Sequence, residues 1–138
     1  MTSEASTEQV VLAYLEAINA GDAAAAAALV AEDFHNEHTS ALGASLQGRA
    51  AYAEKLPRFL AEFRGLRYEV EDIIVSADRA AVAYRMTFTW TSPEGDERPV
   101  AIRGLFRFRV ADGVIAHRVD YWDGTEFQRQ TATATGAP

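Results

Sequence analysis

Residues 100–122 read VAIRGLFRFRVADGVIAHRVDYW, and this stretch decides the fold of the second half of the chain. Before Asp112 and Gly113, apolar residues alternate with arginine or small residues, which is the two-residue period of a β-strand. An Asp-Gly pair between two such runs is a strong signal for a tight hairpin turn. The stretch therefore predicts two long antiparallel strands, residues 100–110 and 114–122.

The second of these strands carries a carboxylate, Asp120, in its interior. Side chains alternate between the two faces of a strand, so Arg118 and Trp122 share the face of Asp120. A large aromatic residue usually marks the buried side. This face is therefore predicted to be the buried one, and if it points into a cavity, Asp120 is a candidate acid or base. The alternative, a carboxylate that pairs with Arg118 or faces water, stays open.

The rest of the chain predicts helices first and strands afterwards. The expected elements are, in order, a helix between Ser6 and Gly21 with a capping box of Ser6 and Gln9, a short helix over 23–31, a short strand over 34–38, a helix over 49–64 that Pro57 interrupts, and strands over 66–75 and 80–90 followed by a turn at 92–96. Helices followed by a meander of long antiparallel strands form an α+β pattern. A strongly curved sheet of this kind can wrap around the helices and leave a pocket at its open end.

The bulk properties fit one domain over residues 1–138, with an ordered core of about 6–130 and a disordered tail from residue 131. A net charge of -7 without a basic run argues against nucleic acid as a partner. The absence of cysteine excludes disulfides, thiolate nucleophiles and Cys-ligated zinc. The polar, acidic start is no signal peptide and no apolar stretch is long enough to span a bilayer. A cytoplasmic protein without membrane contact is expected.

Two histidines and a glutamate lie close together in the predicted strand 34–38. Adjacent strand residues point to opposite faces, so Glu37 and His38 cannot easily bind one ion together with His35, and no metal site is predicted. Asn36 and His38 share the face of Phe34, which is predicted to point inward. His38 could then form a histidine–carboxylate pair with Asp120, or it could be a hydrogen-bonded residue at the pocket rim without chemistry.

The chain resembles the nuclear transport factor 2-like superfamily, specifically its SnoaL-like branch, over roughly residues 8–130. The resemblance rests on Tyr14-Leu15-Glu16-Ala17-Ile18-Asn19-Ala20-Gly21-Asp22, on Gly48-Arg49, and on Asp112-Gly113 leading into Arg118-Val119-Asp120-Tyr121-Trp122-Asp123. It implies a cone-shaped α+β barrel, with N-terminal helices packed in a strongly curved antiparallel sheet whose concave face lines the pocket. The superfamily includes ketosteroid isomerases, limonene-type epoxide hydrolases, polyketide cyclases and proteins that only bind ligands, so the fold alone does not name a reaction.

Compared with the ketosteroid isomerases, the resemblance implies a mixed set of site residues. Their tyrosine in the first helix is matched by Tyr14, which could donate a hydrogen bond to a developing oxyanion or could be an ordinary core residue. Their general base, an aspartate on the short strand, is replaced by His38, and their second acid on the third strand is replaced by Gly104. Steroid isomerisation by that mechanism is therefore not expected.

Compared with the epoxide hydrolases, the resemblance implies an incomplete set. Asp120 matches their aspartate on the final strand, in a similar sequence context. Their Arg-x-Asp pattern on the second strand falls on Arg85 and Thr87 or on Met86 and Phe88, so its aspartate is missing in either alignment. Polyketide cyclases of this branch rely largely on a single pocket carboxylate, and Asp120 is the candidate for it.

These observations together predict a cofactor-independent enzyme that performs acid/base chemistry on an apolar cyclic or polyketide-like molecule, by isomerisation, aldol-type cyclisation or hydration. Asp120, His38 and Tyr14 are the predicted catalytic residues, and substrate contacts are expected from Asn36, Phe88, Trp90, Arg118 and Trp122. The alternative is a ligand-binding or accessory domain without catalysis, in which Asp120 and Arg118 neutralise each other. A homodimer is expected through the outer face of the sheet, which carries Arg103, Arg107, Arg109, His117, Val119 and Tyr121.

Overall fold

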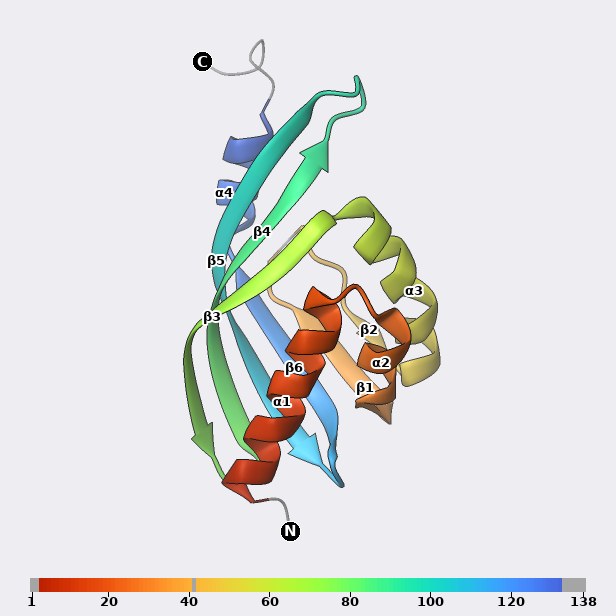
Figure 1. Ribbon diagram of the computed structural model, residues 1–138, viewed down its shortest axis with the longest axis vertical. Helices are drawn as coiled ribbons and strands as arrows, with labels where there is room; N and C mark the ends of the chain where they lie inside the picture. Colours follow the sequence, from red (N-terminus) through yellow and green to blue (C-terminus); the bar gives the residue numbers. More distant parts are fainter. Residues whose placement is uncertain (1–2, 41, 133–138) are drawn as a thin grey trace.

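The computed structural model describes residues 3–40 and 42–132, and its helices and strands follow the predicted order (Figure 1). The elements are α1 (Glu4–Asn19), α2 (Ala23–Ala28), β1 (Val30–His38), β2 (Leu46–Gln47), α3 (Arg49–Glu62), β3 (Arg64–Ser76), β4 (Arg79–Thr91), β5 (Glu97–Ala111), β6 (Val114–Trp122) and α4 (Gly124–Thr131). None of the helices in the described ranges is long and apolar enough to cross a membrane.

The strands form one sheet in the order β2-β1-β6-β5-β4-β3, with α1 packed across one face (Figure 1). The α+β fold class is thereby confirmed. The sheet is mixed, however, and not antiparallel throughout, because β1 runs parallel to β6. No hairpin connects these two strands, since α3 and β3 to β5 lie between them in the chain, so their direction is not fixed by a local turn. With β2 and β3 as edges the sheet is open and not strongly curled, which differs from the strong curvature expected of a cone-shaped barrel.

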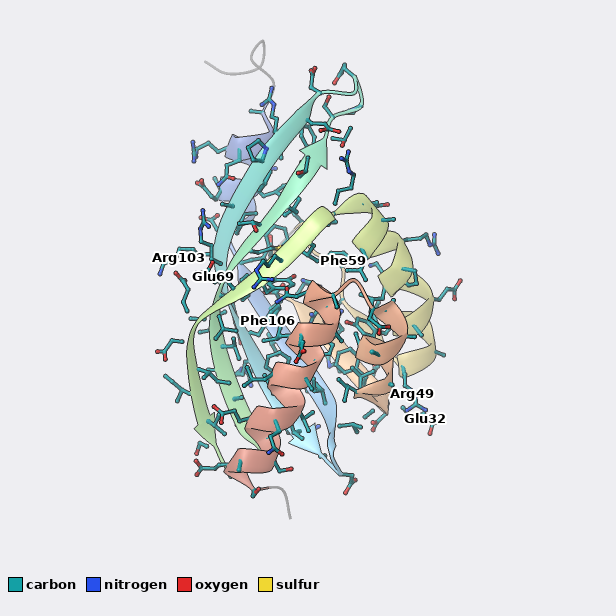
Figure 2. All side chains as sticks on the ribbon, viewed as in Figure 1. Glu32, Arg49, Phe59, Glu69, Arg103 and Phe106 are labelled. Atoms are coloured by element: carbon teal, nitrogen blue, oxygen red, sulfur yellow. The ribbon has the colours of Figure 1, made fainter. Side chains whose placement is uncertain are left out.

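The predicted faces of the β5–β6 hairpin agree with the structure. On β5, Phe106 and Phe108 are buried on the inner face, whereas Arg103 and Arg107 are exposed on the other face, as Figure 2 shows for Phe106 and Arg103. The turn between the two strands has positive φ at both central residues, +54° at Asp112 and +78° at Gly113. This is the backbone of the tight turn that an Asp-Gly pair favours.

Several predicted boundaries were wrong. The helix α1 begins at Glu4, because Ser3 and not Ser6 is the N-cap residue and accepts a hydrogen bond from the Ser6 amide at 3.1 Å. The short second helix ends at Ala28. Of the two alternatives for Pro57, a kink or two abutting helices, the second is excluded, because α3 continues through Pro57 as one helix. Neither β2 nor α4 was predicted, and Thr131, which was expected in a disordered tail, is the last residue of α4. The remainder of that expected tail, residues 133–138, lies outside the described residues.

Candidate active site

A cavity of about 340 Å³ lies between the inner face of the sheet and helices α3 and α4. Most of its wall is apolar, and its aromatic residues include Phe59 and Phe63 of α3, Phe88 of β4, Trp122 of β6 and Phe127 of α4. Its polar groups include Asn36, His38 and Arg118, all from the β1–β6 pair. The cavity thus has the composition of a small-molecule site, an apolar container with a few convergent polar groups.

The register of the parallel β1–β6 pair brings these polar groups together. Asn36 lies opposite Arg118, and His38 lies opposite Asp120. All four side chains point to the inner face, as the alternation of both strands requires. The sequence prediction that Asp120, Arg118 and Trp122 share the inward face with Asn36 and His38 therefore agrees with the structure.

Arg118 is a buried cation, only 7% exposed, whose hydrogen-bond partners are neutral. Its Nε and Nη2 donate to Asn36 Oδ1 at 2.9 and 2.7 Å, and its Nη1 donates to the Tyr14 hydroxyl at 2.9 Å. Its Cζ also lies 5.0 Å from the centre of the Phe106 ring. Within the described part of the chain it forms no ion pair closer than 4.0 Å, so Arg118 and Asp120 are not a salt bridge.

The hydrogen bonds of Arg118 also orient Asn36 and leave donors for a ligand. A guanidinium group can only donate, so Asn36 must present its carbonyl oxygen to Arg118 and its amide nitrogen elsewhere. Arg118 has five N–H groups, of which three are used, and the structure gives the other two no partner among the described residues. The polar end of the cavity is therefore suited to an oxygen atom that carries negative charge.

Asp120 lies behind His38 and is not part of the cavity wall. The carboxylate is 4% exposed; its Oδ1 accepts a hydrogen bond from the Tyr84 hydroxyl at 2.5 Å, and its Oδ2 lies 3.6 Å from His38 Nδ1. Burial raises the pKa of Asp120, against the opposing effects of Arg118 and of the Tyr84 hydrogen bond. Of Asp120 and His38, only His38 lines the cavity.

His38 is neutral at physiological pH. Burial, assisted by the charges of Arg118 and Lys55, lowers the pKa of His38 to about 4. Its Nδ1 is approached by two groups, Asp120 Oδ2 at 3.6 Å and the indole nitrogen Nε1 of Trp122 at 3.4 Å. A bare Nδ1 accepts from Trp122, whereas a proton on Nδ1 would face the Asp120 carboxylate, so the two neighbours favour two alternative tautomers of His38.

The hydrogen bond between Tyr84 and Asp120 depends on Gly104. Tyr84 and Gly104 are partners in the β4–β5 register, and a Cβ on Gly104 would overlap the Tyr84 phenol and approach the Tyr121 carbonyl oxygen to 2.7 Å. Because Gly104 has no side chain, the Tyr84 hydroxyl can reach the Asp120 carboxylate. Where the ketosteroid isomerases carry a second acid, this site has a glycine and a buried tyrosine whose pKa is raised by burial and by Asp120.

The other predicted site residues divide into two groups. Phe88 and Trp122 line the cavity, whereas Trp90 does not. Tyr14 also stays off the wall, because it is fully buried and its hydroxyl bonds to Arg118 and to the hydroxyl of Tyr52.

Sequence reasoning did not assign the wall residues of α3 and α4 to the site. Phe59 and Phe63 were assigned only to the buried side of a helix. Phe127 was missed altogether, although Asp123 directly after the last strand was a signal for a further helix, since its side chain caps α4.

Solved structures with the same fold include several from bacteria. A candidate polyketide cyclase of Xanthomonas campestris is 28% identical, with a TM-score of 0.78 over 94% of this chain and 98% of that one. An epoxide hydrolase of M. tuberculosis, of the LEH-like type, is 19% identical with a TM-score of 0.78 over 92% and 90%. A protein of Catenulispora acidiphila with a ketosteroid isomerase-like fold, in complex with trimethylamine, is 19% identical with a TM-score of 0.78 over 94% and 97%. No curated protein sequence matches the chain.

The fold and the cavity at the inner face of the sheet define the class, the nuclear transport factor 2-like proteins. Residues 11–118 match the model of the SnoaL-like domain family, and the chain belongs to that family. The matched segment ends at Arg118, two residues before Asp120. Membership therefore supports the fold, while the cavity and the arrangement of His38 and Asp120 rest on the geometry described above.

Proposed function

We propose that this protein is an enzyme that removes and returns a proton next to a carbonyl group of an apolar, cyclic or polyketide-like molecule, by isomerisation or aldol-type cyclisation. The observation that carries the proposal is the convergence of Arg118, Asn36 and the His38–Asp120 pair at one side of a cavity whose wall is mostly apolar. The volume of about 340 Å³ suits a small cyclic ligand.

The proposed reaction begins with the carbonyl oxygen of the ligand at the free N–H groups of Arg118 and Asn36. His38 takes a proton from the carbon next to the carbonyl, and the electron pair of that C–H bond moves onto the oxygen as an enolate. The fixed charge of the buried Arg118 stabilises the enolate. Asp120 stabilises the imidazolium that forms.

Two outcomes follow from the enolate. If His38 returns the proton to a different carbon of the conjugated system, the product is an isomer. If the enolate carbon attacks a second carbonyl of the same molecule, a carbon–carbon bond closes a ring, and His38 gives its proton to the new alkoxide. Both outcomes conserve all atoms and electrons of the ligand, so neither requires a cofactor.

This assignment changes the roles that the sequence alone indicated. His38 is the group that exchanges a proton with the ligand, because it lines the cavity, and Asp120 acts through it. Tyr14 positions Arg118 and does not touch the ligand. The likeness to a candidate polyketide cyclase that is 28% identical supports this class of substrate.

A second candidate is a domain that binds a ligand without catalysis. It is favoured by one observation, that Asp120 is separated from the cavity by His38. Both candidates share the site for a carbonyl or carboxylate oxygen at Arg118, so a binding measurement alone does not separate them.

The test is hydrogen–deuterium exchange at the α-carbons of a panel of one- and two-ring ketones, including 2-tetralone, followed by NMR in D₂O. We expect the protein to accelerate exchange over buffer, and we expect His38→Gln and Arg118→Met each to lower the rate by about 100-fold. Arg103→Met on the exposed outer face is the matched control and should keep the rate. Ketones that bind without faster exchange would favour the second candidate and contradict the enzyme.

A further inference from the structure

A cluster of side chains of the metal-ligating types lies on the outer face of the sheet, opposite the cavity. It consists of His35 and Glu37 of β1 and His117 of β6, and its three ligand atoms lie within 4.8 Å of one another. We propose that this His35–Glu37–His117 cluster binds a divalent transition-metal ion. The proposal is independent of the proposed catalytic function.

The backbone brings these three residues together. His35 and Glu37 are two residues apart in one strand and therefore share a face. His117 is the register partner of His35 across the parallel β1–β6 pair. His38, the third histidine of the chain, points to the opposite face, as predicted. The pairing of His35 with a residue more than eighty positions away is not a local property of the sequence, so it could not be predicted.

The side chains lie close to the positions that they would take as ligands of a metal ion. His117 Nε2 and Glu37 Oε1 are 3.2 Å apart, close to the roughly 3.3 Å between neighbouring ligands of a tetrahedral zinc ion. The rings of His35 and His117 are stacked, with centres 4.8 Å apart and planes 2° from parallel. One imidazole must therefore rotate to bring its nitrogen into the coordination sphere. Such a rotation is accessible, because all three side chains are only partly buried.

The chemistry of the ligand set selects the kind of metal. Two imidazole nitrogens and one carboxylate oxygen suit zinc, nickel or copper and disfavour magnesium, which prefers oxygen ligands alone. Three protein ligands leave room for water in the remaining position. Arg109, the register partner of His117 on β5, adds a positive charge beside the site. Its removal should tighten metal binding, and its presence sets the site apart from an acidic patch that attracts any cation.

A bound ion would join β1 to β6, the two strands that carry Asn36, His38, Arg118 and Asp120 on their other face. An ion that binds the folded state and not the unfolded chain also stabilises the fold, so zinc should raise the melting temperature in a concentration-dependent way.

The test uses the untagged full chain, freed of metal with a chelator, and zinc chloride as the probe. Isothermal titration should give one saturable site per chain with a Kd well below about 1 mM. His35→Ala and His117→Ala should each weaken binding at least about tenfold, and Glu37→Gln should weaken it less. The chain has three histidines and no cysteine, so His38→Gln is the matched control and should bind zinc as the wild type does. Arg109→Gln should bind more tightly.

NMR of the histidine Hε1 protons provides the second readout and confirms that each variant is folded. Zinc should shift the signals of His35 and His117 and leave that of His38 unchanged. The proposal is overturned if the wild type shows no saturable site, if the variants of His35 and His117 bind like the wild type, or if zinc binding is lost in His38→Gln. If either alanine variant fails to fold, the zinc affinity of Glu37→Gln and the zinc-induced Hε1 shifts test the proposal instead.

Discussion

His38 and Asp120 make opposite contributions to stability as the pH falls, although they are neighbours. The pKa of His38 is lowered to about 4 in the folded state, below its ordinary 6.5, so the unfolded chain binds more protons between these values. The contribution of His38 is therefore full above about pH 6.5 and is lost as the pH falls toward 4. The pKa of Asp120 is raised, so in this range the folded state gains stability from Asp120 as the pH falls.

The removal of His38 should therefore change how stability depends on pH. We expect the free energy of unfolding of His38→Gln, relative to wild type, to rise by up to about 3 kcal/mol between pH 7 and pH 4. Urea unfolding followed by circular dichroism at several pH values measures this difference. A constant difference across the range would contradict the buried, neutral His38, and direct NMR titration of its ring should give a pKa near 4.

At the scale of elements, the β1–β6 pair explains both what the sequence could predict and what it could not. Alternation within each strand placed Asn36 and His38 on one face, and it did the same for Arg118 and Asp120, because side-chain direction is a local property. The pairing of the two strands is not local, and no turn fixes its direction or register. The hydrogen bonds between Arg118 and Asn36, the place of Asp120 behind His38, and the meeting of His35 with His117 all depend on that register.

The β4–β5 pair carries a prediction about Gly104. Gly104→Ala should destabilise the protein by about 1–3 kcal/mol, because the new Cβ displaces the Tyr84 phenol and breaks its hydrogen bond to Asp120. Tyr84→Phe, which removes only the hydroxyl, should cost about 1–2 kcal/mol. Because both changes act on one hydrogen bond, the double variant should be less destabilised than the sum of the two single variants. Chemical denaturation of the four proteins measures the cycle, and full additivity would show that Gly104 does not act through Tyr84.

At the scale of the whole molecule, the two faces of the sheet differ in what covers them. The helices cover the inner face (Figure 1). The outer face carries exposed apolar side chains. Leu105 is 36% exposed and Tyr121 39%, and the two are register partners across β5 and β6. Exposed apolar residues that adjoin on a sheet face can contribute to a protein interface. This arrangement supports the proposal, made first from the sequence, that two copies of the chain associate through this face.

The homodimer can be tested with a matched pair of leucines. Sedimentation velocity in the presence of a chelator, which removes any contribution from metal, should show a dimer for the wild type. Leu105→Lys should shift the protein to monomer, because a lysine at a packed interface would have to bury its charge. Leu12→Lys is the control, since Leu12 is a similarly exposed leucine, at 40%, on α1. A monomeric wild type would refute the dimer, and dissociation by the Leu12 variant alone would move the interface from the sheet to the helices.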